Sequence, residues 1–138
     1  MGLLAKAPPK ALARLWGVFG RAPAFHWLRR PEVGGVMVRG RAGATGAPFN
    51  LGEMTVTRCS LKLQEGGVVG HAYVQGRDTA HATRAALVDA LMQTAEAETV
   101  RRAILAPLAE AHQATRAARA AKAAATRVDF FTMTRGED

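Results

Sequence analysis

Three side chains that can take part in acid–base or anion chemistry stand together in residues 76–82. Asp78 and His81 are three positions apart, so on a helix they share a face, where a carboxylate can pair with an imidazole. Arg77 would then lie beside an anion bound at the helix N-terminus. The same residues also have a structural interpretation, in which Asp78 caps the helix and His81 lies in its first turn. We favour the structural interpretation and retain Arg77, Asp78 and His81 as the catalytic candidates.

Other familiar catalytic or ligand motifs do not occur in the sequence. It contains no GxxxxGK[ST] phosphate loop, HExxH, CxxC or GxSxG, and the glycines at 40, 43 and 46 fit a turn-rich loop better than a phosphate loop. The single cysteine, Cys59, excludes an intramolecular disulfide and a thiolate-rich zinc or iron–sulfur site built by this chain alone. We expect Cys59 to be buried and to pack as a small hydrophobic side chain. We also expect that the chain has no metal site and binds no cofactor.

The chain is strongly basic. Its 138 residues hold 19 Lys and Arg against 11 Asp and Glu, a formal net charge of +8. Such a charge attracts polyanions, which include nucleic acid, nucleotide phosphates and acidic protein surfaces. The alternative explanation of the positive net charge is codon bias, which would enrich the whole chain in alanine and arginine. No window of 18 residues is apolar and free of charge, so we expect no membrane-spanning helix.

Alternation and turn residues predict a small antiparallel meander in residues 26–76. The four strand candidates are residues 25–30, 36–41, 54–63 and 68–75. Residues 65–67, Glu-Gly-Gly, join the last two as a tight hairpin. We expect residues 31–35 to form a turn within the first pair and residues 40–52 to form a loop.

The polar face of these strands carries four basic residues. They are Arg39, Arg41, Arg58 and Lys62. Two interpretations stay open for them: an ordinary solvated face, or an anion-binding surface for a phosphate-bearing ligand or an acidic partner.

Helical patterns occupy both ends of the chain. Pro8 and Pro9 can begin a first helix within residues 1–25, a segment whose basic, acid-free character also suits a transit peptide or a membrane-surface helix. In residues 77–126 we expect a pair of long helices, from Asp78 to about 102 and from Pro107 to about 126. The second is dominated by alanine, with Arg116, Arg119 and Lys122 recurring on one face.

The last segment, residues 127–138, is predicted to be an extended tail. We interpret it either as a docking segment for a partner or as a final strand of the sheet. Its partner-binding candidates are Val128, Asp129, Phe130, Phe131, Met133 and Arg135. With the preceding segments it completes an α+β chain that we treat as one domain, residues 1–138.

Four segments taken in order resemble a known family. They are GRDTAHA at 76–82, ALVDALMQ at 86–93, APL at 106–108 and RVDFFTMTRG at 127–136. In this order and spacing they resemble the G subunit of the bacterial carbon–phosphorus lyase system for phosphonate breakdown, the PhnG family. The likeness covers roughly residues 26–136, and residues 129–133 are its most specific part. It departs in residues 1–25 and at Thr134, where the family usually has an aliphatic residue.

The resemblance implies a subunit of a cytoplasmic bacterial complex that contains subunits H, I and J. With H, I and the L protein, the G subunit supports formation of α-D-ribose 1-methylphosphonate 5-triphosphate, in which the phosphonate displaces adenine from ATP. ATP is then a substrate of the complex, the nucleosidase chemistry belongs to subunit I, and the iron–sulfur chemistry belongs to subunit J. We expect this chain to have a structural role with little chemistry of its own and no homodimer outside the complex.

Two other functions compete with the subunit hypothesis. A nucleic-acid-binding protein is suggested by the charge and by the basic face at residues 116–122, although no aromatic residues are interleaved for base stacking. A stand-alone enzyme would use Arg77, Asp78 and His81.

Overall fold

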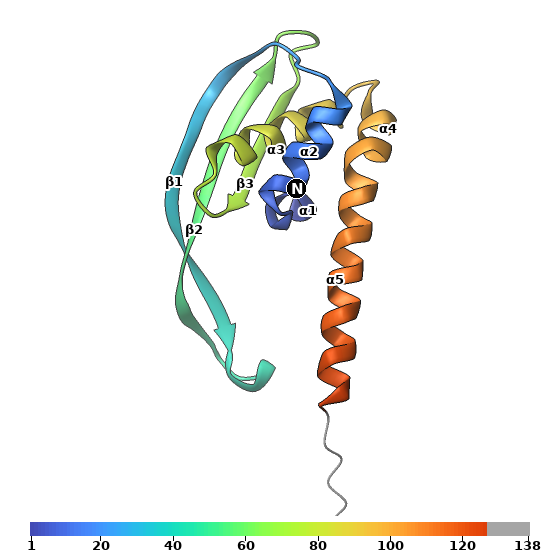
Figure 1. Ribbon diagram of the computed structural model, residues 1–138. Helices are drawn as coiled ribbons and strands as arrows, with labels where there is room; N and C mark the ends of the chain where they lie inside the picture. Colours follow the sequence, from blue (N-terminus) through green and yellow to red (C-terminus); the bar gives the residue numbers. More distant parts are fainter. Residues whose placement is uncertain (127–138) are drawn as a thin grey trace, which may run out of the picture.

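The computed structural model describes residues 1–126, which form a three-stranded antiparallel sheet packed against helices (Figure 1). The strands are β1 (Phe25–Arg41), β2 (Pro48–Leu63) and β3 (Val69–Gln75), in the order β1-β2-β3. The helices are α1 (Gly2–Lys6), α2 (Pro9–Phe19), α3 (Thr79–Leu91), α4 (Ala97–Val100) and α5 (Ala106–Ala125). The predicted α+β class is confirmed. No helix in this part of the chain is long and apolar enough to cross a membrane.

The predicted turn at residues 31–35 is wrong, because β1 runs through it as one strand. Arg29 pairs with Ser60 and Glu32 pairs with Arg58, so Arg30 and Pro31 together oppose one residue of β2. This arrangement is a β-bulge, where a proline, which has no N–H, costs no regular ladder bond. The meander therefore has three strands, and the connection predicted for residues 40–52 shrinks to residues 42–47.

The long pairing of β1 with β2 continues beyond the third strand. β3 reaches only as far as the pair Val56–Gln75, whereas β1 and β2 pair on to Arg41 and Pro48. We call residues 34–55, the two-stranded part with its connecting turn, the arm. Figure 1 shows the arm running past the body of the molecule, and none of its residues is buried.

The core lies between the sheet and α3, where backbone and helix approach closely. Gly70 of β3 faces the backbone oxygen of Ala86, and a Cβ built at Gly70 would overlap that atom. Ala82, Ala86 and Ala90 are fully buried in α3. Because the residues at this contact are small, the backbones of α3 and β3 lie close together. The core is filled here by the close approach of the two backbones and not by large side chains.

The single helix predicted for residues 78–102 is also wrong. α3 ends at Leu91, where the Thr94 hydroxyl donates to the Leu91 carbonyl over 2.7 Å and accepts from the Glu96 amide over 3.2 Å. These bonds satisfy groups that a helix end leaves free. The second helix starts earlier than predicted, because α4 continues through the π-helical segment Arg101–Leu105 into α5. The end of α5 at Ala125 agrees with the prediction.

The N-terminal helix begins at Pro9 as expected, with a separate short helix, α1, before it. Leu12 of α2 is fully buried, while Trp16 and Phe19 pack against the core. Residues 1–19 are therefore part of the folded body.

Candidate functional site

Asp78 caps the N-terminus of α3. One of its carboxylate oxygens accepts a hydrogen bond of 2.8 Å from the backbone N–H of His81. The carboxylate therefore satisfies one of the free amides of the first turn, which is the structural interpretation of this residue. The alternative, a bond between the Asp78 carboxylate and the His81 ring, is not formed.

The His81 ring points into the body instead. It is 2% exposed, and Nε2 lies 2.8 Å from the carbonyl oxygen of Leu4 in α1. Because a carbonyl only accepts, Nε2 must carry the proton and donate. Nδ1 is buried and has no hydrogen-bond partner among residues 1–126. Arg77 is exposed, so the three candidates do not converge on a common space. This arrangement favours a structural role for Asp78 and His81.

The four basic strand residues are not gathered into one cluster. Lys62 lies over the body, opposite His26, and Arg58 lies opposite Glu32. Arg39 and Arg41 lie near the end of the arm, where a guanidinium nitrogen of Arg41 donates to the Gly46 carbonyl over 3.0 Å. From Pro48, opposite Arg41, to Lys62 is 14 positions along β2, or ~45 Å of strand. Any anion binding by these residues would therefore involve separate places, and it stays a prediction.

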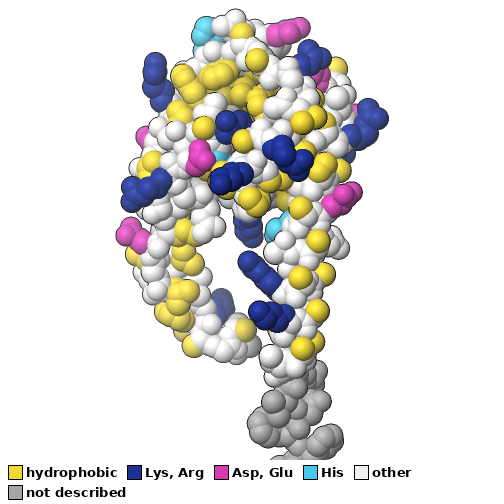
Figure 2. Space-filling model, in the orientation of Figure 1, with side chains coloured by type: hydrophobic (Ala, Val, Ile, Leu, Met, Phe, Trp, Pro, Cys, Tyr) yellow, Lys and Arg dark blue, Asp and Glu magenta, His cyan; other side chains and the backbone are white. Residues whose placement is uncertain are grey.

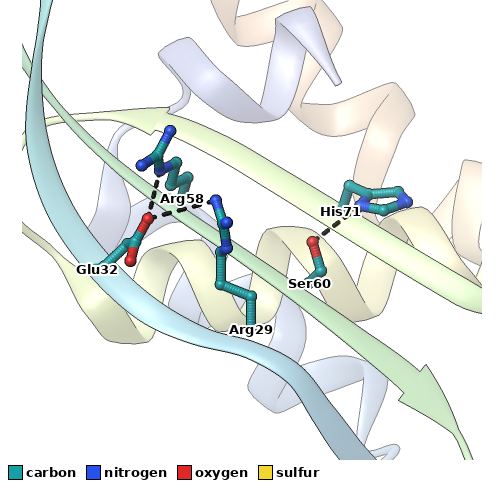
Figure 3. A network of polar contacts seen from close by, with 5 residues as sticks. All are labelled: Arg29, Glu32, Arg58, Ser60 and His71. Atoms are coloured by element: carbon teal, nitrogen blue, oxygen red, sulfur yellow. Dashed lines mark hydrogen bonds and ion pairs between the residues drawn. The ribbon is translucent and has the colours of Figure 1, made fainter.

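The β-bulge assembles a polar network that the sequence did not predict (Figure 3). Glu32 accepts from Arg58 and lies 3.4 Å from a guanidinium nitrogen of Arg29. A separate contact joins β2 to β3, where Ser60 pairs with His71 and its hydroxyl is 2.9 Å from Nδ1 of the His71 ring. All these side chains reach solvent or are only half-buried, so their ion pairs contribute little to stability. A turn at residues 31–35 places Glu32 outside the sheet, so this prediction could not include the ion pairs of Glu32 with Arg29 and Arg58.

Cys59 is buried, as predicted. Its side chain is 2% exposed, and burial raises the pKa of the thiol to about 11. A thiol with this pKa is almost wholly protonated near neutral pH and is a poor nucleophile. Within residues 1–126, no group of three His, Cys, Asp or Glu side chains could hold a metal ion.

A hollow of about 430 Å³ lies between α1–α2 and α5. We call it the basic groove and define it by its basic side chains, Lys6, Arg116 and Arg119, together with His112. Its floor is apolar and is formed by Leu3, Ala7, Pro8, Ala11, Leu108 and Ala111. Figure 2 shows Lys and Arg side chains facing the open space between α5 and the arm. The sequence could not predict this surface, because it joins segments about a hundred residues apart.

α5 projects from the body next to this groove. Leu108 is its last buried residue, and residues 109–126 are all exposed. Figure 1 shows α5 and the arm extending to the same side of the molecule. Both elements thus lack a covering layer within the described chain. The partner-binding candidates at 128–135 lie outside the described residues.

The whole chain matches a known protein family. The family model described as "Phosphonate metabolism protein PhnG" covers residues 1–136. The chain belongs to the PhnG family. The match includes residues 1–25, where the resemblance noted from motifs was loose, as well as the arm, the basic groove and α5.

A named PhnG relative is similar over the full chain. It is the alpha-D-ribose 1-methylphosphonate 5-triphosphate synthase subunit PhnG of Rhizobium meliloti (strain 1021), which is 45% identical over 138 residues. These residues are 100% of this chain and 88% of the relative. The resemblance to the PhnG family is thereby confirmed.

Proposed function

We propose that this chain is a subunit of the assembly that makes α-D-ribose 1-methylphosphonate 5-triphosphate during phosphonate breakdown. The observation that carries the proposal is the 45% identity, over the entire chain, to a relative named as a subunit of that synthase. At this identity and coverage the fold and the subunit surfaces are expected to be shared. The enzyme activity belongs to the assembly, in which ATP and a phosphonate are the substrates.

In the proposed reaction a phosphonate oxygen forms a bond to C1 of the ribose of ATP, and the bond from C1 to adenine breaks. The chain contributes structure rather than acid–base groups. Two features support this division of work: His81 is buried against Leu4, and Asp78 is occupied as a helix cap. We assign no bound cofactor to this chain.

The proposed partners are subunits H, I and J and the L protein, within the bacterial cytoplasm. The exposure of the arm and of α5 supports this proposal, because partner subunits would cover both elements. On the arm, Met37, Phe49 and Leu51 are 55%, 45% and 66% exposed. Large apolar side chains exposed together on a projecting ribbon are typical of protein contact surfaces.

Reconstitution tests the proposal. Subunits H and I and the L protein from the same source are incubated with ATP and methylphosphonate, with and without this chain, and released adenine is measured. We expect adenine release only when the chain is present. Undiminished release in its absence would refute the proposed role.

A further inference from the structure

We infer that the basic groove is a docking site for an acidic, amphipathic segment of a partner subunit. This inference rests on the proposed function, since it names the chemistry of one contact within that assembly.

The charge of the groove is uncompensated in the described chain. Lys6 reaches it from α1, and Arg116 and Arg119 reach it from α5. None of the described residues that line it is acidic, and none of these three basic side chains forms an ion pair within residues 1–126. Arginine binds carboxylates through two parallel hydrogen bonds, so the groove is complementary to Asp and Glu side chains.

The apolar residues that line the groove favour an occupant with an apolar face. Leu3, Leu108 and the alanines between the helices line the base of the hollow. An acidic segment with one apolar face would bury this floor and place its carboxylates against the basic rim.

The shape favours a length of chain over a compact ligand. The α5 residues that line the groove run from Leu108 to Arg119, ~16 Å of helix, and a second hollow, lined by α5 residues alone, adjoins it at His112 and Arg116. The groove thus runs along a helix whose residues 109–126 are exposed. A helix gains most of its stability from packing, so a partner along this face would stabilise α5.

Three variants of equal length test the inference in the co-expressed assembly. R116Q/R119Q removes two positive charges from the groove. A114E/A121E makes the same change in net charge on the far side of α5, and R116K/R119K keeps the charge. Gln, Glu and Lys all favour helix, so α5 is retained, and far-UV circular dichroism checks this. The measurement is the amount of each chain that co-purifies with tagged partner subunits at low and at raised salt.

We expect R116Q/R119Q to weaken association by roughly tenfold or more, and to weaken its dependence on salt. A114E/A121E should associate like the parent chain, and R116K/R119K should fall between. If R116Q/R119Q and A114E/A121E lost association equally, net charge alone would explain the effect, and the docking site at the basic groove would be refuted.

A different ligand would give another result. If R116Q/R119Q assembles normally but the complex shows a raised KM for ATP, the docking inference is overturned and the groove is assigned to a polyphosphate. If the parent chain itself fails to co-purify, it is the proposed function that fails.

Discussion

His81 and Leu4 are 77 positions apart, yet the imidazole Nε2 of His81 donates a 2.8 Å hydrogen bond to the Leu4 carbonyl. The bond ties α1 to the first turn of α3, and Leu4 itself is buried in the core. The N-terminal helix is therefore anchored by a polar contact as well as by packing.

His81→Ala is expected to destabilise the fold. The change leaves a cavity and an unpaired carbonyl, which together cost about 2–4 kcal/mol of unfolding free energy. Urea denaturation measures the loss, and the exposed His26→Ala is the control that should be nearly neutral. A His81→Ala chain of parental stability that assembles but abolishes adenine release would instead indicate a catalytic role.

Gly70→Ala should be more damaging than an alanine at most strand glycines. Its Cβ would overlap the Ala86 backbone oxygen and lie 2.8 Å from the Ala90 Cβ, so β3 and α3 must separate. We expect a loss of several kcal/mol, on the order of 3. Gly34→Ala in the arm is the matched control, because nothing lies within 4 Å of the new Cβ. Similar stabilities for the two variants would contradict the close approach of α3 to the sheet.

The Cys59 thiol should resist alkylation in the folded chain. With its pKa raised to about 11, the thiolate is about a hundredfold scarcer at pH 8 than for a thiol of pKa 9.0. Labelling with iodoacetamide, followed by mass spectrometry, should be slow for the native chain and fast in denaturant. Rapid labelling of the native chain would show that the thiol is accessible.

Burial of the same thiol makes stability depend on pH in the alkaline range. The folded state holds this proton more tightly than the unfolded state, so its contribution is fully present below pH ~9. Above that pH the unfolded thiol ionises first, and the unfolding free energy should fall until the pH passes the folded pKa of about 11. The parent chain should therefore lose more stability between these pH values than Cys59→Ala.

The tail is predicted to dock on a partner. Deleting residues 128–138 removes Phe130 and Phe131 and should abolish co-purification with the other subunits, while the stability of the remaining body is preserved. Affinity purification of the co-expressed assembly measures this effect. A truncated chain that still co-purifies would reject the docking role of the tail.

Local chemistry explains which parts of the fold could be predicted from sequence. The glycines at 66 and 67 both adopt positive φ, so the hairpin after β2 could be predicted from those residues alone. The Asp78 cap could also be predicted from local sequence, because Asp is a preferred N-cap residue before a helical pattern. Pro31 was misinterpreted because a proline before two glycines suggests a turn, whereas a bulge becomes evident only when the facing strand is known.

The missed features depend on contacts between distant residues. The Thr94 hydroxyl caps the end of α3, and residues 92–96 contain no Gly or Pro that would signal the break. The His81–Leu4 bond and the basic groove require the N-terminal helices to pack beside residues 81 and 108–119, which no local pattern predicts. The family resemblance supplied the function where local chemistry could not.

Native mass spectrometry of the chain, expressed alone and with subunits H, I and J from the same source, tests the central claim most directly. We predict a stable stoichiometric complex on co-expression, and a lone chain that aggregates because its arm and α5 lack a covering layer. A well-folded lone monomer that does not associate with those subunits would contradict the account.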